Sequence, residues 1–429
     1  MADARIPGPT PCGVRIRHGT APMGFLLTTT PPPLEDSLMT HSVILAARRT
    51  PIGRFFGGLS RVDAPQLGAW AVEAAVQSAG ISADQVDECI MGCVLQAGLG
   101  QNPARQAALK AGLPHTISAQ TINKVCGSGL QAVMTADQSI RAGDQHIVVA
   151  GGLENMTRAP HYAEVRSGLK FGPGTMHDHM AHDGLECAFE GWGMGMAAEH
   201  TAEKYSINRA DMDELSALSH TNAARAAAEG WFDAELIPLT AAQVKQKVDI
   251  TSDEGVRADS TPEGLAKLRP AFKKDGTVTA GNASQISDGA AAVVVASESA
   301  AAAAGATIMA KIIGTNTVGV APRDLFEAPG LGVEKLLSDH QLTVDDVDLF
   351  ELNEAFAAQA LCNMRHLKVD PSRVNICGGS IAIGHPIGAS GARVLVTLIN
   401  QMQRVDAKRG VASLCLGGGN AVSMLLERA

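Results

Sequence analysis

One cysteine of this sequence stands in a setting that suits a nucleophile. Cys126 lies in the run Asn123-Lys-Val-Cys-Gly-Ser-Gly129, directly before a stretch whose apolar residues recur at helical spacing. A cysteine at a helix N-terminus has its thiolate favoured by free backbone N–H groups and by the helix dipole. A small buried cysteine that only packs against its neighbours fits the same pattern. The local sequence therefore leaves both a nucleophile and a packed thiol open.

Three further residues could act together with a nucleophilic thiol. His385 lies between a glycine and a proline, which places its imidazole on a stiff turn where it could serve as the base for a thiol. Cys415 ends an apolar strand before a run of glycines and could exchange a proton with a substrate carbon. Asn353 ends a predicted strand, and its amide could hold a water or donate toward an oxyanion. In isolation, each also fits an ordinary structural role: a loop histidine, a buried strand cysteine and a turn residue.

An internal repeat explains how these distant residues could meet. The segment 81–87 reappears as 342–348, and the loop Cys126-Gly-Ser-Gly129 reappears as Gly388-Ala-Ser-Gly391. After each loop come a predicted helix and an apolar strand that ends in glycines. Landmarks that recur in one order at similar offsets predict two similar α/β halves, each with a sheet covered by helices. A pseudo-two-fold axis between the halves would bring the Cys126 loop beside the loop that follows His385.

The composition excludes several classes of protein. Apolar residues make up 45% of the 429 residues, which is ordinary for a globular protein, and no segment is long and apolar enough to predict a membrane span. A net charge of −9 argues against nucleic-acid binding, which needs a broad basic surface. The eight cysteines are scattered without a CxxC pair, so we expect no disulfide framework or zinc site and a reducing, cytoplasmic location. His177, His179 and His182 could bind a metal, but we interpret them as solvated loop histidines and expect no metal.

The chain divides into segments of different character. The first 38 residues contain seven prolines and no apolar periodicity, which predicts either a disordered tail or translation from an upstream start with Met39 as the true initiator. Residues from about 156 to 276 have no counterpart in the repeat, and they contain predicted helices at 197–205 and 209–230. We therefore predict an N-terminal extension, a first half, an inserted cap domain and a second half, at residues 1–40, 41–156 plus 277–305, 157–276 and 306–429.

Four separated motifs, taken together, resemble the signature set of the thiolase family. They are Asn-Lys-Val-Cys126-Gly-Ser-Gly, Asn353-Glu-Ala-Phe, Gly-His385-Pro-Ile-Gly-Ala-Ser-Gly and Cys415-Leu-Gly-Gly-Gly. The resemblance runs from about Val43 to the C-terminus. It implies a duplicated α/β fold with five layers, α-β-α-β-α, and an inserted loop domain that binds CoA. It further implies a homo-oligomer, dimer or tetramer, that takes CoA as a substrate and needs no other cofactor.

The resemblance also implies a role for each residue of the motifs. Cys126 becomes acylated after His385 takes its proton, and Cys415 acts as acid and base on the acetyl-CoA carbon. Asn353 positions a water that, with His385, stabilises the enolate oxygen. The backbone N–H groups of Cys126 and Gly417 form a second oxyanion hole. The positions expected to contact CoA or the acyl group are Leu185, Met194, Arg257, Phe272, Ser284 and Phe356.

The activity implied is transfer of an acyl group between CoA and acetyl-CoA in fatty acid metabolism. One direction condenses two acetyl-CoA molecules to acetoacetyl-CoA, and the reverse is CoA-dependent thiolysis of a 3-oxoacyl-CoA. A decarboxylating 3-oxoacyl synthase on the same fold would lack the second catalytic cysteine, so Cys415 argues against it. An inactive acyl-CoA-binding relative would be expected to lose Cys126, His385 or Cys415, and the sequence keeps all three.

One position departs from the family pattern. In biosynthetic thiolases a histidine commonly precedes the methionine that here is Met194, whereas this chain has Gly193. That position lines the acyl pocket, so a glycine should enlarge or reshape it. We therefore expect acetoacetyl-CoA to be used, and branched or longer 3-oxoacyl chains to be accepted as well.

Overall fold

The computed structural model describes residues 41–429, so the predicted extension and the Met39 start lie outside the described residues. The two repeats build equivalent elements in the same order, except that the strand Ser118–Ile122 of the first repeat has no counterpart strand in the second. The first consists of β1 (Ser42–Arg49), α1 (Ala64–Ala79), β3 (Glu88–Gly92), α2 (Pro103–Lys110), β4 (Ser118–Ile122), α3 (Ser128–Ala142), β5 (Ile147–Asn155) and β8 (Ser287–Ser297). The second consists of β9 (Ala310–Gly319), α9 (Ala328–Asp339), β10 (Leu349–Leu352), α10 (Ala357–Leu367), α12 (Ser390–Arg404), β11 (Arg409–Leu416) and β12 (Asn420–Arg428). Shorter elements are β2 (Gly53–Arg54), α8 (Glu298–Ala304) and α11 (Ser380–Ile383).

The strands confirm the internal repeat. In the first half the order is β1-β8-β5-β3-β4, with β3 parallel to β5, and β8 antiparallel to both β5 and β1. The second half repeats this as β9-β12-β11-β10, with β10 parallel to β11, and β12 antiparallel to both β11 and β9. The halves join edge to edge, where Val43 pairs with Lys311 and Ile44 with Ala310.

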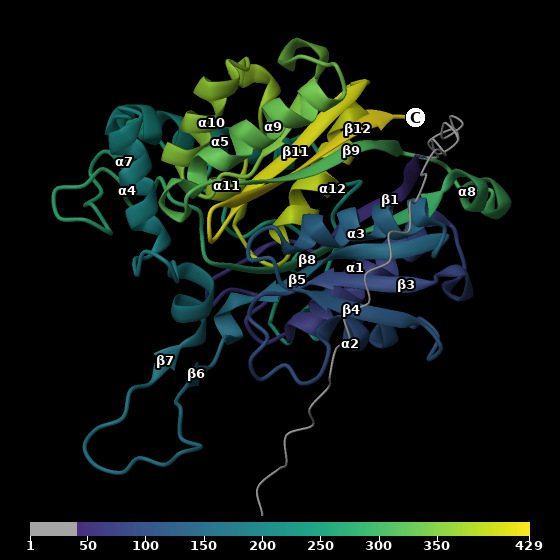
Figure 1. The fold of residues 1–429 in the computed structure, drawn as a ribbon, viewed down its shortest axis with the longest axis horizontal. Helices are drawn as coiled ribbons and strands as arrows, with labels where there is room; N and C mark the ends of the chain where they lie inside the picture. The colour runs from purple at the N-terminus through teal and green to yellow at the C-terminus, as the bar shows by residue number, and fades with distance from the viewer. Residues whose placement is uncertain (1–40) are drawn as a thin grey trace, which may run out of the picture. The chain divides into compact units, whose positions relative to one another are not determined.

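Helices cover both faces of each half-sheet, as the layered α/β prediction requires (Figure 1). Alternate residues of β8 point to opposite faces of the sheet. Val294 packs in the cluster that contains α1 and α2, whereas Val293 and Val295 pack with α3 and α12. On the second half, α9 and α10 cover the outer face through a cluster that includes Phe350 and Leu425. The central helices α3 and α12 therefore lie between the half-sheets, which gives the five predicted layers.

The two central helices meet at glycines, which explains how equivalent loops come together. A Cβ at Gly129 would lie 2.7 Å from the backbone nitrogen of Ala392, and a Cβ at Gly391 would lie 2.4 Å from that of Leu130. Both distances are too short for any side chain, so only glycine permits this crossing. The crossing places the N-terminus of α3, which follows Cys126, against the N-terminus of α12, which follows the His385 loop.

A long segment without a counterpart connects β5 to β8. It contains β6 (His161–Tyr162), β7 (His177–Asp178), a π-helical turn (Met180–Leu185), α4 (Met194–Lys204), α5 (Arg209–Ala228), α6 (Ala241–Val244) and α7 (Pro262–Leu265). The two predicted helices are α4 and α5. In the second half, residues 417–419 alone connect β11 to β12. The assignment of residues 157–276 to a separate CoA-binding domain stays a prediction. In the part of the chain that the structure describes, no helix is both long and apolar enough to cross a membrane.

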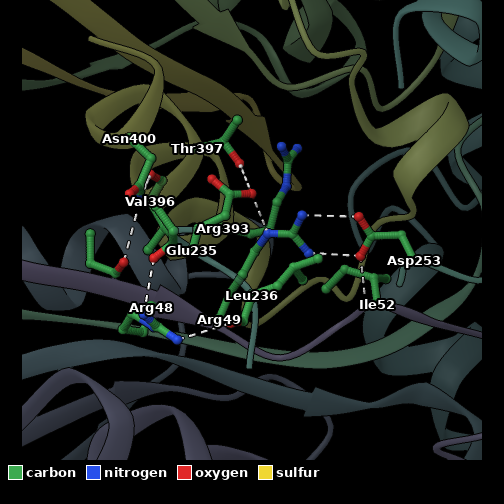
Figure 2. A network of polar contacts seen from close by, with 12 residues as sticks. Arg48, Arg49, Ile52, Glu235, Leu236, Asp253, Arg393, Val396, Thr397 and Asn400 are labelled. Atoms are coloured by element: carbon green, nitrogen blue, oxygen red, sulfur yellow. Dashed lines mark hydrogen bonds and ion pairs between the residues drawn. The ribbon is translucent and has the colours of Figure 1, made fainter. Parts of the chain in front are cut away.

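A buried ion cluster ties this segment to both halves (Figure 2). The Arg49 side chain is fully buried at the end of β1, and its Nε donates to Glu235 at 2.6 Å. Its two terminal nitrogens donate to the carboxylate of Asp253 at 2.7 and 2.9 Å. Thr397 of α12 donates to the same Glu235 oxygen at 3.1 Å. Glu235 and Asp253 belong to the long segment, so the cluster connects three parts of the chain.

Replacing Arg49 by methionine should destabilise the protein strongly. The change keeps much of the side-chain volume but leaves Glu235 and Asp253 buried without their cation. Removing one partner of a buried ion pair typically costs about 3–5 kcal/mol in the free energy of unfolding. Urea unfolding followed by circular dichroism measures the loss, with Lys335→Met as the control because Lys335 forms an exposed ion pair with Asp339. Equal midpoints for the two variants would contradict the role of the cluster.

Candidate active site

A cavity of about 520 Å³ brings together residues from both halves and from the long segment. Ten of the eleven predicted site residues line it: Cys126, Leu185, Met194, Arg257, Phe272, Ser284, Phe356, His385, Cys415 and Gly417. The eleventh, Asn353, is not on the wall of the cavity. It is 1% exposed and follows β10, next to the strand that carries Cys415.

A strained turn presents Cys126 to the cavity. Val125 has a φ of 47°, a left-handed conformation that a β-branched residue rarely adopts. Ser128 holds the turn: its hydroxyl accepts from the Lys124 N–H at 2.8 Å and donates to the Val125 carbonyl at 2.6 Å. A Cβ at Gly127 would lie 2.5 Å from Leu416 of β11, so this glycine lets the turn pack against the strand that carries Cys415.

Two backbone N–H groups at the start of helix α3 are not available to the Cys126 sulfur. The N–H groups of Gly127 and Ser128 donate to the carbonyls of Lys124 and Val125, so they are not free for the sulfur. Burial raises the pKa of the Cys126 thiol to about 12, although the N–H groups of Cys126 and Gly417 act in the opposite direction. At rest Cys126 is therefore a neutral thiol, which would need a base in order to act as a nucleophile.

The raised pKa predicts how the free protein reacts with iodoacetamide. Only the thiolate is alkylated, so modification of Cys126 should keep accelerating from about pH 7 to pH 10, because the thiolate fraction grows throughout that range. Peptide mass spectrometry after timed quenching follows Cys126 separately from the other cysteines, and glutathione serves as the unburied reference thiol. A plateau already near pH 7 would mean that the thiolate is preformed.

His385 is held as a neutral imidazole. Its Nδ1 lies 2.6 Å from the Ser390 hydroxyl, and that hydroxyl donates to the Pro386 carbonyl at 2.9 Å. Because the single hydroxyl proton goes to a carbonyl, Nδ1 must carry the proton of the imidazole, which leaves Nε2 as an acceptor. Burial, and after it the charge of Arg393, lowers the pKa of His385 to about 3. The imidazole is therefore neutral at physiological pH.

The second cysteine belongs to the same site. Cys415 is 1% exposed near the end of β11, and burial raises the pKa of its thiol, with the charge of a Cys126 thiolate adding to the effect. Gly418 and Gly419, with φ values of 89° and 87°, then turn the chain into β12. A Cβ at Gly417 would lie 3.3 Å from Val125, so this turn packs against the Cys126 turn.

In the Asn353 amide, the oxygen has a hydrogen-bond partner, whereas the nitrogen has none among the described residues. Its Oδ1 accepts from the Ser380 hydroxyl at 2.6 Å. Its Nδ2 has no hydrogen-bond partner among residues 41–429, although it is buried. A buried amide nitrogen is normally satisfied by protein, water or ligand. This free donor suits the predicted role of Asn353 in holding a water.

Glu154 is a buried carboxylate that supports the site from outside the cavity, and the sequence analysis missed it. Its carboxylate is fully buried and accepts from the N–H groups of Val94, Leu95 and Gly388 at 2.9–3.1 Å. It thereby ties the His385 loop to the end of β3. Burial raises its pKa to about 7. A carboxylate at the end of the apolar run Ile147–Asn155 was the available signal.

The histidines of the β6–β7 region make other contacts. Nδ1 of His179 pairs with Asp183 at 2.6 Å, and its Nε2 accepts from the Ala97 N–H at 3.3 Å. His182 lies 3.3 Å from Glu186. In residues 41–429, no group of three or more histidine, cysteine, aspartate or glutamate side chains is arranged to hold a metal ion.

Comparison with known proteins identifies the family. Residues 42–299 match the family "Thiolase, N-terminal domain", and residues 306–428 match "Thiolase, C-terminal domain". The chain is 50% identical over 392 residues to an acetyl-CoA acetyltransferase of Cupriavidus necator, covering 91% of this chain and 100% of that protein. It is 48% identical over 392 residues to a probable acetyl-CoA acyltransferase of Staphylococcus aureus, with the same coverage. The crystal structure of the Bacillus anthracis acetyl-CoA acetyltransferase superposes with a TM-score of 0.88 at 40% identity, over 91% of this chain and 99% of that one. The chain belongs to the thiolase family.

Proposed function

We propose that this thiolase, an acyltransferase enzyme, moves an acyl group between CoA and acetyl-CoA through a thioester on Cys126. One observation carries the proposal: Cys126, His385 and Cys415 line one cavity, with the N–H groups of Cys126 and Gly417 beside the sulfur. Relatives named acetyl-CoA acetyltransferase support acetyl-CoA as the substrate.

The first half-reaction transfers an acetyl group to the enzyme. Nε2 of His385 takes the proton of the Cys126 thiol while the sulfur attacks the thioester carbonyl of acetyl-CoA. The negative charge that develops on the carbonyl oxygen is stabilised by the N–H groups of Cys126 and Gly417. The bond between the carbonyl carbon and the CoA sulfur then breaks. CoA leaves with a proton from Cys415, and Cys126 carries the acetyl group.

The second half-reaction forms the carbon–carbon bond. The Cys415 thiolate removes a proton from the methyl group of a second acetyl-CoA, and its high pKa makes it a strong base for this step. The protonated His385 and a water held by Asn353 stabilise the enolate oxygen. The enolate carbon attacks the acetyl group on Cys126 and releases acetoacetyl-CoA. Cys126 then recovers the proton from His385. Thiolysis of a 3-oxoacyl-CoA runs through the same steps in reverse.

Intact-mass spectrometry after mixing with acetyl-CoA tests this function. We expect an acetyl adduct on Cys126, together with CoA-dependent cleavage of acetoacetyl-CoA. An inactive acyl-CoA-binding protein would give neither result. A 3-oxoacyl synthase would give condensation only with a substrate that can lose carbon dioxide. Absence of both the adduct and the cleavage would reject the proposal.

Gly193 is the residue most relevant to the lengths of acyl chain that the enzyme accepts. Its φ and ψ of −70° and 156° are open to any residue, and a Cβ there would meet only the Leu185 carbonyl, at 4.0 Å. The position therefore opens into free space beside the cavity. We propose that this space admits 3-oxoacyl chains longer than four carbons.

Filling this space should narrow the substrate range. Gly193→His should lower kcat/KM for the C6 and C8 3-oxoacyl-CoA substrates about 10–200-fold relative to C4, because methylene groups would lose their contacts. Gly193→Ala is the matched control and should have a smaller effect. Thiolysis rates for the three chain lengths measure the change. A steep fall beyond C4 in the unaltered enzyme would refute the wide-pocket proposal.

We also propose that the enzyme acts in fatty acid metabolism in the cytoplasm, as a homotetramer or homodimer, with no cofactor besides its CoA substrates. The thiolase resemblance and the scattered cysteines support these points. Sedimentation velocity would distinguish the two assemblies.

A further inference from the structure

A chain of buried polar contacts connects the central helix α12 to Asn353. Arg393, on the first turn of α12, is fully buried. Its Nη2 donates to the Ser380 hydroxyl at 3.0 Å, and the Ser380 oxygen lies 2.6 Å from Oδ1 of Asn353. Figure 2 shows Arg393 beside the ion cluster around Arg49.

The direction of each hydrogen bond in this chain follows from chemistry. A guanidinium only donates, so the Ser380 oxygen must accept from Arg393. Ser380 then has one proton left, and it points to the amide of Asn353. The amide must present its oxygen to that proton, so its NH₂ group faces away from Ser380. The orientation of an amide is often ambiguous, but here Arg393 settles it through Ser380.

The amide orientation decides what Asn353 can do for the reaction. With Oδ1 occupied by Ser380, the free Nδ2 is a donor that can hold a water whose proton points to an enolate oxygen. The reversed amide would present its oxygen and would repel the developing negative charge. We propose that Ser380 and Arg393 are positioning residues that lock the Asn353 amide with its NH₂ group toward the enolate site. This inference rests on the proposed function, because it assigns the device to the enolate step.

Arg393 is itself held in place by charge. Its Nη1 lies 3.6 Å from the buried carboxylate of Glu351, and its Nε and Nη1 have no hydrogen-bond partner among the described residues. Glu351 Oε2 and Glu235 Oε2 are also without partners. Buried polar atoms of this kind are commonly bridged by ordered water. The guanidinium is therefore anchored by Coulomb attraction, and Nη2 remains for Ser380.

Ser380→Ala tests the proposal, because it removes one oxygen atom and keeps the Cβ. The two half-reactions are measured separately: acetylation of Cys126 by rapid-quench intact mass, and the enolate step by exchange of the methyl hydrogens of acetyl-CoA in D₂O. We expect exchange and condensation to fall by about 10–100-fold, less than the 10²–10³ typical when an oxyanion donor is removed outright. Acetylation of Cys126 should change by less than about 2-fold, because its oxyanion hole consists of backbone N–H groups.

Thr397→Val is the matched control. Thr397 is as buried as Ser380 and donates to Glu235 in the same polar network, but it makes no contact with Asn353. The two variants should have similar thermal midpoints, and only Ser380→Ala should slow the exchange. A double-mutant cycle adds a second readout: in an Asn353→Ala background, Ser380→Ala should cause no further loss, because it acts through the missing amide.

The possible outcomes separate the two proposals. If the unaltered enzyme forms no acetyl adduct on Cys126, the proposed function fails. If the adduct forms but Ser380→Ala exchanges hydrogens as fast as Thr397→Val, the positioning role is overturned. An equal loss of acetylation and exchange in Ser380→Ala also overturns it, because that pattern indicates a general distortion of the site. Additive losses in the double mutant would likewise contradict action through Asn353.

Discussion

Cys126→Ala should abolish the acetyl adduct and lower the rate of acetoacetyl-CoA cleavage by at least about 10⁴-fold. The size of the loss follows from the position of Cys126 in both half-reactions, first as the attacking sulfur and then as the leaving group. The remaining His385, Cys415 and backbone N–H groups can bind and polarise a substrate, but no other group can carry the acyl chain. Cleavage is followed through the absorbance of acetoacetyl-CoA, and the adduct through intact mass.

Cys89→Ala is the control for the loss of a buried thiol. Cys89 lies in β3 with no exposed surface and is not among the residues that line the cavity. Its replacement should lower stability slightly and leave the cleavage rate within about 3-fold of the unaltered enzyme, since it makes no contact with the reacting atoms. Residual cleavage in Cys126→Ala at the Cys89→Ala level would show that the reaction does not need the acyl-enzyme.

Cys415→Ala should separate the half-reactions. The change removes the group that takes the methyl proton from acetyl-CoA, and losing a general base typically lowers a rate by about 10²–10⁴-fold. Condensation and hydrogen exchange in D₂O should fall by that factor. Acetylation of Cys126 should fall much less, because His385 and the N–H groups of Cys126 and Gly417 remain and the departing CoA thiolate can take its proton from water instead of Cys415. The acetyl adduct should then accumulate.

The measurement that decides this prediction is the ratio of the two rates in one variant. Cys377→Ala, which alters a buried cysteine outside the cavity, should change neither rate substantially. An equal loss of acetylation and condensation in Cys415→Ala would contradict the prediction that Cys415 acts mainly on the enolate step. Unchanged exchange would remove it from the enolate step altogether.

The sequence predicted which residues would meet in the cavity better than it predicted whether their side chains are protonated. The order of motifs predicted that Cys126, His385 and Cys415 would meet, because the repeat places equivalent loops on either side of a pseudo-two-fold axis. The local pattern around Cys126 could not give the protonation of its thiol, since it shows neither the depth of burial nor which N–H groups the turn itself consumes. Those quantities depend on the packed cavity.

The other features that the sequence did not predict depend on contacts between segments that are distant in the chain. Ser380 begins the short helix α11, and a loop separates that helix from α12, which carries Arg393. Asn353 lies in another motif, so no spacing rule connects the three residues. Glu154 ends an apolar strand, and only the fold reveals that three backbone N–H groups surround its carboxylate. The helices of the long segment were predictable because they are amphipathic or well capped, whereas the buried ion pairs of Arg49 with Glu235 and Asp253 that hold the segment were not.

The unequal connections after β5 and β11 have an evolutionary consequence. If the two halves descend from one ancestral unit, a symmetric pair of such units would have carried two equivalent pockets. A long insertion after one strand and a three-glycine turn after the other made the pockets unequal, so one half now supplies the proposed nucleophile and the other supplies the proposed base and the second thiol. The single asymmetric site would then have arisen because the two copies took different catalytic roles, without any change of architecture.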